Sequence, residues 1–243
     1  MNIKCVILAA GKNTRLDTGM PKSLLQVNGI SLLERHIQQF NKVGCQEFCI
    51  VTGHNPEPIE KIIAVLSEKY SVEIDTVHNE RYDLENGFSV SVAEDWVNKS
   101  SIDGFYLTMG DHIFQQSFVQ AFHKGVEKGI TEELCLAVDV PSKFNEHIDI
   151  DDVTRVFVET NGSIKQIGKG LLEYNRYDTG LFYLKPGVFH ALKSCFEHGK
   201  FTISDMVSTL IQQDQATTLD IVGHLWNDVD NFSDLDNTSK LDF

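Results

Sequence analysis

The sequence predicts an α/β fold in which a mostly parallel sheet is flanked by helices, and three observations support that prediction. The chain begins with a short apolar run, Cys5 to Leu8, that has the composition of a strand buried on both faces. Apolar segments of strand length then alternate with segments of helical periodicity as far as Met109. With 243 residues, 42% of them hydrophobic, the chain is long enough to bury a large core as one domain over residues 1–243.

The elements of the first half follow from local signals. Ser31 and Glu34 have the S-x-x-E spacing of a capping box, which predicts a helix that ends at Gly44. His36 lies on the apolar face of that helix, and we expect it to be a packed structural histidine. The other segments expected in this half are strands at 48–51, 72–77 and 105–109 and helices around 59–66 and 90–96.

The pattern changes in the second half. Two strand-like segments, 153–158 and 163–167, flank the dipeptide Asn161-Gly162, which predicts a β-hairpin. We expect the region from about 141 to 180 to form an arm over the carboxyl edge of the sheet, where ligands of parallel sheets bind. A strand at 179–184 and helices around 188–195 and 205–211 complete the expected elements.

Composition excludes several classes of function. A net charge of -14 argues against a nucleic-acid partner or an anionic membrane surface, because both need a basic face. No segment approaches the roughly 20 apolar residues of a membrane span, and no signal-type stretch opens the chain. The five cysteines are scattered and contain no CxxC pair. We therefore expect a reduced, cytoplasmic protein.

The turn after the first strand has the chemistry of a phosphate-binding loop. Ala9, Ala10 and Gly11 allow close backbone approach, and Lys12, Arg15 and Lys22 bring three cations to the same place. Free backbone N–H groups and cations at the end of a buried strand can cradle a polyphosphate. The alternative is an ordinary βα turn whose cations stay solvated.

These residues form part of a longer pattern. Leu8-Ala9-Ala10-Gly11-x-x-x-Arg15-Leu16, followed by Pro21-Lys22-x-Leu24-Leu25-x-Val27-x-Gly29, resembles the signature of nucleotidyltransferases that join a nucleoside triphosphate to a phosphorylated small molecule. The resemblance implies the nucleotide-diphospho-sugar transferase type of fold. Asn13 departs from the pattern, because the family usually has glycine there. Asparagine tolerates a left-handed backbone better than most residues, so the turn can survive.

The resemblance also implies roles for individual residues. Leu8, Ala9, Ala10 and Gly11 would bind the nucleotide through the backbone. Arg15 would hold the β- and γ-phosphates, and Lys22 would neutralise charge on the α-phosphate. Magnesium is the expected cofactor, held by Asp111 and by Asp228, with Asp230 in reserve. Asn86, Gly87 and Ser89 either complete the base site or form only a loop and a helix cap.

Motifs in the second half of the chain resemble a narrower group within this family. Asp149-Ile150-Asp151-Asp152-Val153-Thr154-Arg155-Val156, Ile167-Gly168-Lys169-Gly170-Leu171 and Tyr177-Asp178-Thr179-Gly180 are similar to cytidylyltransferases of the CTP:inositol-1-phosphate type. CTP and a small phosphorylated alcohol are therefore the implied partners. Lys169 would anchor the acceptor phosphate, with Arg155, Asp178 and Thr179 nearby; a plain hairpin-end lysine is the alternative. Some members continue into a membrane-embedded phosphatidyltransferase domain, whereas this sequence ends at Phe243, which leaves its pathway open.

Other interpretations remain at this stage. Related enzymes act on phosphocholine, 2-aminoethylphosphonate or sugar 1-phosphates, and their motifs overlap. A choline acceptor would favour an aromatic cage, for which Tyr174, Tyr177 and Tyr183 are available. A hypothesis of a different class is a catalytically lapsed nucleotide-binding regulator, for which Asn13 is the warning sign. Dimers are common in the family, so a homodimer is compatible with the resemblance.

Overall fold

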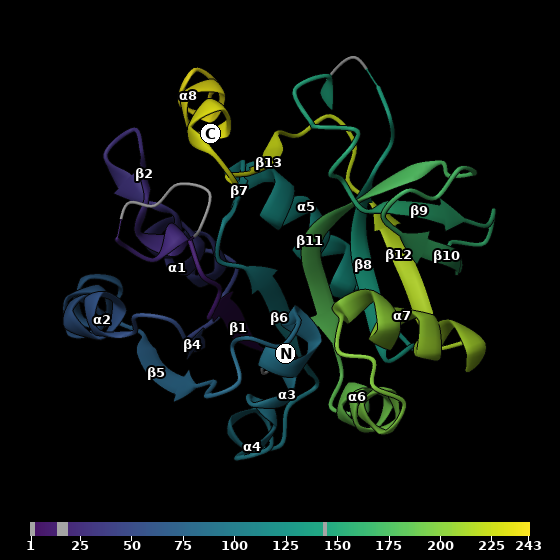
Figure 1. Cartoon of the computed structure of the whole chain (residues 1–243), viewed down its shortest axis with the longest axis horizontal. Coiled ribbons are helices and arrows are strands. Elements are labelled where there is room, and N and C mark those ends of the chain that lie inside the picture. Colours follow the sequence, from purple (N-terminus) through teal and green to yellow (C-terminus); the bar gives the residue numbers. More distant parts are fainter. Residues whose placement is uncertain (1–2, 14–18, 143–144) are drawn as a thin grey trace.

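A nine-stranded mixed sheet forms the centre of the computed structural model, which describes residues 3–13, 19–142 and 145–243 (Figure 1). The strands are β1 (Ile3–Ala9), β2 (Gln26–Val27), β3 (Ile30–Ser31), β4 (Glu47–Thr52), β5 (Glu73–His78), β6 (Gly104–Met109), β7 (His112–Phe114), β8 (Leu134–Asp139), β9 (Arg155–Val158), β10 (Ile164–Gly168), β11 (Arg176–Leu184), β12 (Ala216–Asp220) and β13 (Trp226–Asp228). The helices are α1 (Leu32–Asn41), α2 (Glu57–Tyr70), α3 (Asn86–Ser91), α4 (Glu94–Val97), α5 (Gln116–Val126), α6 (Val188–Glu197), α7 (Ile203–Gln212) and α8 (Phe232–Ser239), with a short 3₁₀ helix η1 (Lys22–Leu24).

The sheet has a parallel half and a half built around β11. β6, β1, β4 and β5 are parallel neighbours in that order. β11 then pairs antiparallel with β6, β8 and β9, and β12 pairs parallel with β8. The predicted α/β fold with a flanked sheet is therefore confirmed.

β1 is buried on both faces because its side chains alternate between two hydrophobic cores. Val6 and Leu8 pack with α3, α4, α6 and α7, whereas Cys5 and Ile7 pack with α1, α2 and α5. Side chains alternate along every strand, so a strand between two helical layers is buried on both faces. Its positions are therefore apolar, except where a polar side chain has a partner, as Lys4 has in Glu47. The continuous apolar run at the start of the sequence has this structural cause.

The predicted first helix forms, but only half of its capping box does. The Ser31 hydroxyl accepts a hydrogen bond from the Glu34 backbone N–H at 3.2 Å. The Glu34 carboxylate turns to α2 instead, where it accepts from Lys69 Nζ at 2.6 Å and from the Tyr70 hydroxyl at 2.8 Å. The Glu34 carboxylate thus binds side chains of α2 and not the Ser31 backbone N–H, its partner in a full capping box.

His36 is packed inside the molecule, as expected. Its ring lies near Phe40 and Phe114, with centroid distances of 6.5 and 5.8 Å. Burial lowers the pKa of His36 to about 3, so the imidazole is neutral at physiological pH.

The predicted hairpin is present and is joined to the sheet. Gly162 has a φ of 90°, and the Asn161 side chain accepts a hydrogen bond from the Ser163 N–H at 3.1 Å. Pairing of β9 with β11 attaches the hairpin to the antiparallel half. The boundaries of a substrate arm at 141–180, and the organisation of residues 1–243 as a single domain, stay predictions. Within the described residues, no helix has both the length and the apolar character to cross a membrane.

Candidate active site

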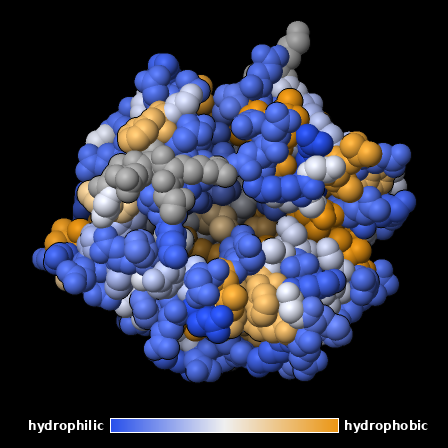
Figure 2. Space-filling model, in the orientation of Figure 1, coloured by the Kyte–Doolittle hydropathy of each residue, from blue (hydrophilic) through white to orange (hydrophobic). Residues whose placement is uncertain are grey.

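Two adjoining cavities lie at the carboxyl edge of the sheet. The larger has a volume of about 440 Å³ and the smaller about 180 Å³. Asn86, Met109 and Asp111 line both of them, so the cavities meet at these residues. Figure 2 shows this face of the molecule hollowed near its centre, with hydrophilic residues around the hollow.

The smaller cavity is bordered by the loop after β1. Leu8, Ala9, Ala10, Gly11 and Lys12 line it, as the sequence predicted for a nucleotide site. The Ala10 carbonyl accepts a hydrogen bond from the His54 N–H at 3.1 Å, which ties the loop to the end of β4. Arg15, the predicted phosphate-binding arginine, lies outside the described residues.

Asn13 and Lys22 mark the two sides of that loop. The Asn13 amide donates a hydrogen bond to the Met20 carbonyl at 3.0 Å, so the departure from glycine adds a link across the loop. Lys22 lines the smaller cavity, pairs with the Asp230 carboxylate and lies 3.6 Å from Asp111 Oδ2. Lys22 therefore sits between the two cavities, next to the carboxylates predicted to hold a metal.

The predicted base-site residues divide into two kinds. Asn86 and Ser89 line the smaller cavity, while Asn86 Oδ1 also accepts a hydrogen bond from the Ile203 N–H at 2.9 Å and so caps α7. Gly87 faces that helix junction: a Cβ there would lie 2.6 Å from the Phe201 carbonyl oxygen. These residues thus form both a helix cap and a cavity wall, and their contact with a base stays a prediction.

Gly87 and Gly11 provide a matched pair of substitutions. We expect Gly87→Ala to lower the free energy of unfolding by about 1–3 kcal/mol, because the new methyl group meets backbone atoms that cannot rotate away. A Cβ at Gly11 has no neighbour within 4 Å, so Gly11→Ala should leave stability unchanged. Urea unfolding of both variants measures the difference. Equal stability of the two variants would contradict the packing role of Gly87.

Asp111 and Asp228 are brought together by backbone pairing. The Gly110 N–H donates to the Leu8 carbonyl at 2.8 Å, which places Asp111 beside the loop after β1. In a small separate sheet, β13 pairs with β7 so that Asp228 lies opposite His112. The Val229 N–H donates to the Asp111 carbonyl at 2.9 Å and fixes this arrangement.

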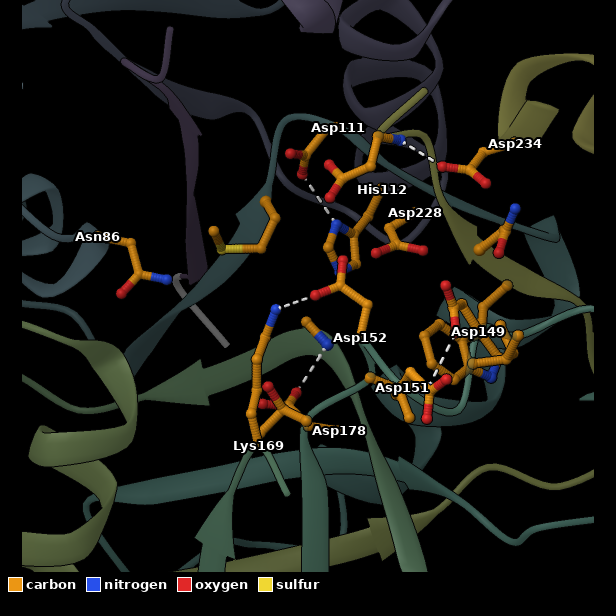
Figure 3. A pocket seen from close by; sticks show the side chains of 18 of the residues that line it. Asn86, Asp111, His112, Asp149, Asp151, Asp152, Lys169, Asp178, Asp228 and Asp234 are labelled. Atoms are coloured by element: carbon orange, nitrogen blue, oxygen red, sulfur yellow. Dashed lines mark hydrogen bonds and ion pairs between the residues drawn. The ribbon is translucent and has the colours of Figure 1, made fainter. Parts of the chain in front are cut away.

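Among the residues that the structure describes, Asp152, Asp228 and Asp230 form a group that could hold a metal ion. One oxygen of each lies within 4.8 Å of the other two, and oxygen ligands of this kind suit Mg²⁺. Asp111 stands beside this group and is hydrogen-bonded by His112 Nδ1 at 2.9 Å (Figure 3). The sequence predicted Asp111, Asp228 and, in reserve, Asp230, but it missed Asp152.

Charge and burial oppose each other among these groups. Burial alone would raise the pKa of the Asp111 carboxyl, but the His112 hydrogen bond and the Lys22 ammonium hold it below its usual range. Burial, together with the neighbouring Asp230 and Asp111, raises the pKa of Asp228 despite the opposing effect of His112. Burial would lower the pKa of His112, whereas Asp111, Asp228 and Asp178 raise it overall. The cluster therefore favours a cation at its centre.

The predicted acceptor residues do not all face the larger cavity. Lys169 and Asp178 line it, and Lys169 Nζ pairs with Asp152 Oδ1 at 2.5 Å (Figure 3). Thr179 is fully buried, and its hydroxyl donates to the Ala137 carbonyl at 2.8 Å, so the geometry gives no support for contact with an acceptor. Arg155 donates instead to the carbonyls of Ile150 and Leu171.

Asp178 allows a test of the charge balance through pH. Burial raises its pKa to about 6, while the Gly180 N–H and His112 act in the opposite direction. The folded protein therefore binds this proton more tightly than the unfolded chain, and stability from this group falls as pH rises from about 4 to about 6. We compare the free energy of unfolding of Asp178→Asn with that of wild type at two pH values. The difference, variant minus wild type, should be about 1–2 kcal/mol more positive at about pH 7.5 than at about pH 4.

Urea unfolding of wild type and Asp178→Asn at the two pH values makes this measurement. Asp236→Asn is the control, because Asp236 lies on α8 with a side chain 70% exposed. An equal change at both pH values would show that the Asp178 carboxyl does not bind the extra proton.

With this geometry established, comparisons with known proteins define the class. Residues 5–142 match the model of the MobA-like NTP transferase domain. This match covers more than half of the chain, and the chain therefore belongs to that nucleotidyltransferase family.

Individual relatives are more specific. The chain is 33% identical over 240 residues to a protein named bifunctional IPC transferase and DIPP synthase from Aquifex aeolicus, covering 97% of this chain and 50% of the relative. It is 32% identical over 233 residues to a protein of the same name from Archaeoglobus fulgidus, covering 96% and 42%. The chain thus spans about half the length or less of these relatives.

Solved structures agree on the fold. The structure of the inositol-1-phosphate CTP transferase from T. maritima matches with a TM-score of 0.83 at 22% identity, covering 99% of this chain and 96% of that one. A UDP-glucose pyrophosphorylase solved with UDP-glucose matches with a TM-score of 0.80 at 17% identity, covering 99% and 98%. These likenesses place the chain in the nucleotide-diphospho-sugar transferase type of fold.

Proposed function

We propose that the chain is a CTP-dependent cytidylyltransferase that joins CMP to a small phosphorylated alcohol and releases pyrophosphate. The observation that supports this most is the pair of cavities that meet at Asp111. One is bordered by the phosphate-binding loop and the other by Lys169 and several carboxylates. A nucleotide in the first cavity and an acceptor in the second would meet beside Lys22.

The proposed reaction needs positioning and charge neutralisation and no covalent nucleophile. A phosphate oxygen of the acceptor attacks the α-phosphorus of CTP in line, and pyrophosphate leaves. Both reactants are anions, so cations must offset their repulsion while the walls fix their orientation. Lys22 lies between the cavities and is the described residue best placed to stabilise the charge on the α-phosphate.

Magnesium is the cofactor that we propose. Asp152, Asp228 and Asp230 would hold it, with Asp111 beside them. When bound, the ion would add positive charge next to the triphosphate. The raised pKa of Asp228, caused by burial and by neighbouring carboxylates, fits a site that gains stability when a cation is present.

A polyol phosphate such as inositol 1-phosphate is the acceptor that we favour. Carboxylates accept hydrogen bonds from hydroxyl groups, and Asp149, Asp151 and Asp178 line the larger cavity with Lys169 as the phosphate partner. The names of the relatives from Aquifex aeolicus and Archaeoglobus fulgidus point to the same chemistry.

A choline acceptor has weaker support. Tyr177 and Tyr183 are buried, and Tyr174 stacks on Tyr177 with ring centroids 5.8 Å apart. These tyrosines therefore form no cage around the larger cavity among its described lining residues. 2-Aminoethylphosphonate stays an alternative, since its amine could pair with the carboxylates, and a sugar 1-phosphate is a further one. All five cysteines are free and buried, which fits the cytoplasmic location that we propose.

Pyrophosphate release tests the proposal. The protein is mixed with Mg²⁺, CTP and, in turn, inositol 1-phosphate, phosphocholine, 2-aminoethylphosphonate and glucose 1-phosphate, with UTP and ATP as alternative donors. We expect release with CTP and inositol 1-phosphate. If CTP binds but no acceptor yields pyrophosphate, the hypothesis of a lapsed nucleotide-binding regulator replaces this one.

Lys22 should be essential for that activity. We expect Lys22→Ala to lower kcat by about 10²–10³-fold, because a positioned cation at developing charge is removed. Lys61→Ala is the matched control, since the Lys61 side chain on α2 is 74% exposed and distant in sequence from the site. Steady-state kinetics of the two variants give the comparison, and their unfolding midpoints should equal that of wild type. Full activity of Lys22→Ala would show that Lys22 takes no part in the mechanism.

We propose Asp152 as a metal ligand in addition to the residues that the sequence predicted. We expect Asp152→Asn to weaken Mn²⁺ binding to the protein alone by about 10-fold or more, because one of three carboxylates loses its charge. Electron paramagnetic resonance titration of Mn²⁺ measures this without an activity assay. Asp236→Asn again serves as the surface control, and an unaltered Mn²⁺ affinity of Asp152→Asn would exclude Asp152 from the metal site.

A further inference from the structure

Arg155 lies at the start of β9, behind the wall of the larger cavity, and its guanidinium links two separate turns. NH2 donates to the Ile150 carbonyl at 2.9 Å, and NH1 donates to the Leu171 carbonyl at 3.1 Å. The guanidinium carbon lies 4.9 Å from the centre of the Tyr174 ring, which supports it from one side. One side chain therefore links residues 149–153 to residues 169–174, next to the point where β9 and β10 pair at Arg155 and Gly168.

Each of these turns supplies a charged group to the cavity. Asp152 comes from the first turn, Lys169 comes from the second, and the two form an ion pair across the space between them (Figure 3). Asp152 also belongs to the carboxylate group with metal-binding geometry. The arginine and the ion pair thus bridge the same two turns, Arg155 from behind the wall and Asp152–Lys169 from within the cavity.

Val153 and Tyr174, at the C-terminal ends of the two turns, pack against the hydrophobic core, whereas the apolar residues in the middle of the turns are exposed. Leu172 is 92% exposed and Ile150 is 51% exposed. Surface segments with few buried apolar contacts open easily unless polar contacts hold them. The first turn has some internal order, because the Asp149 side chain accepts from the Asp151 N–H at 2.9 Å. That bond does not reach the second turn.

We propose that Arg155 is a positioning residue: it clamps the two turns together so that Asp152 and Lys169 face the cavity at the spacing that metal and acceptor phosphate require. This inference rests on the proposed function and extends it to a residue that touches neither substrate. This role takes the place of the predicted one as an acceptor ligand in our proposal, since both terminal nitrogens of Arg155 donate to backbone carbonyls.

The chemistry of the side chain fits a clamp. A guanidinium is a planar fork that can serve two carbonyls at fixed angles, whereas a lysine ammonium is a single point on a flexible stem. Arg155 Nε is buried without a hydrogen-bond partner, which costs free energy. The side chain keeps this orientation despite that cost. The hydrogen bonds to the two carbonyls and the contact with the Tyr174 ring offset the cost.

The test uses Arg155→Lys and Arg155→Ala in the full chain. The matched controls are Arg176→Lys and Arg176→Ala, because Arg176 is a half-buried arginine of the neighbouring strand β11 that pairs with Asp220 away from both cavities. Hydrogen exchange measured by mass spectrometry follows peptides covering 149–153 and 169–174. Mn²⁺ titration and steady-state kinetics at saturating Mg²⁺ complete the set.

We expect Arg155→Ala to speed exchange in both turns while β1 and β6 stay protected. Mn²⁺ affinity should fall by about 10-fold and the acceptor KM should rise by about 10-fold, with the KM for CTP and kcat changed less than about 3-fold. Arg155→Lys should give intermediate values, and the Arg176 variants should match wild type in all of these measurements.

Two results would overturn the inference. Unchanged exchange in either turn of Arg155→Ala would show that the arginine does not clamp them, whatever the activity. Faster exchange with unchanged Mn²⁺ affinity and unchanged acceptor KM would show that the clamp does not position the site. If wild type releases no pyrophosphate at all, the proposed function fails, and exchange and Mn²⁺ binding still decide the clamp. If Arg155→Ala does not fold, the same criteria apply to Arg155→Lys.

Discussion

Repulsion between carboxylates is the constraint that the whole site must meet. Asp111, Asp152, Asp178, Asp228 and Asp230 line one cavity, where partial burial strengthens their mutual repulsion. Three basic side chains offset this charge: Lys22 lies between Asp111 and Asp230, Lys169 pairs with Asp152, and His112 is hydrogen-bonded to Asp111. The same excess of negative charge would be offset by the divalent ion that we propose.

The backbone holds these groups in place by pairing segments that are remote in sequence. The end of β6 is hydrogen-bonded to the end of β1, and β13 crosses to β7, so three parts of the chain converge beside Asp111. Gly180 leaves the space that the His112 ring needs beside Asp111. It has a φ of 73°, and a Cβ at that position would lie 2.5 Å from the His112 ring. The imidazole can therefore reach Asp111 only because β11 has no side chain there.

Local signals in the sequence were enough to predict the parallel half of the fold and a loop of small residues after β1, which lines the smaller cavity. The apolar run Cys5 to Leu8 and the small residues after it report their surroundings directly, since both faces of the run are buried and the loop borders a cavity. The role of Asp152 could not be predicted in this way. It lies in an acidic stretch that looks like a solvated turn, and only the folded chain brings it to Asp228 and Asp230.

Arg155 and Thr179 show the same limit from the other side. Both occur in motifs similar to those of known enzymes, yet the orientation of their side chains depends on contacts with Leu171 and Ala137 that no local pattern encodes. For Gly87 the sequence left a base contact and a loop-and-cap role open, and its close approach to the Phe201 carbonyl depends on a partner remote in sequence. The residue types indicated that these positions were constrained. Which contact constrains each of them depends on the tertiary structure.

The division of the sheet into two halves has an evolutionary consequence. The loop after β1 belongs to the parallel half, whereas Lys169 and Asp178 belong to the strands around β11. In the proposed enzyme, mutations that remodel the hairpin and β11 would exchange one acceptor for another while donor recognition is inherited intact. A single ancestral scaffold could thus diversify its products through one half of the sheet, with the other half shielded from that selection.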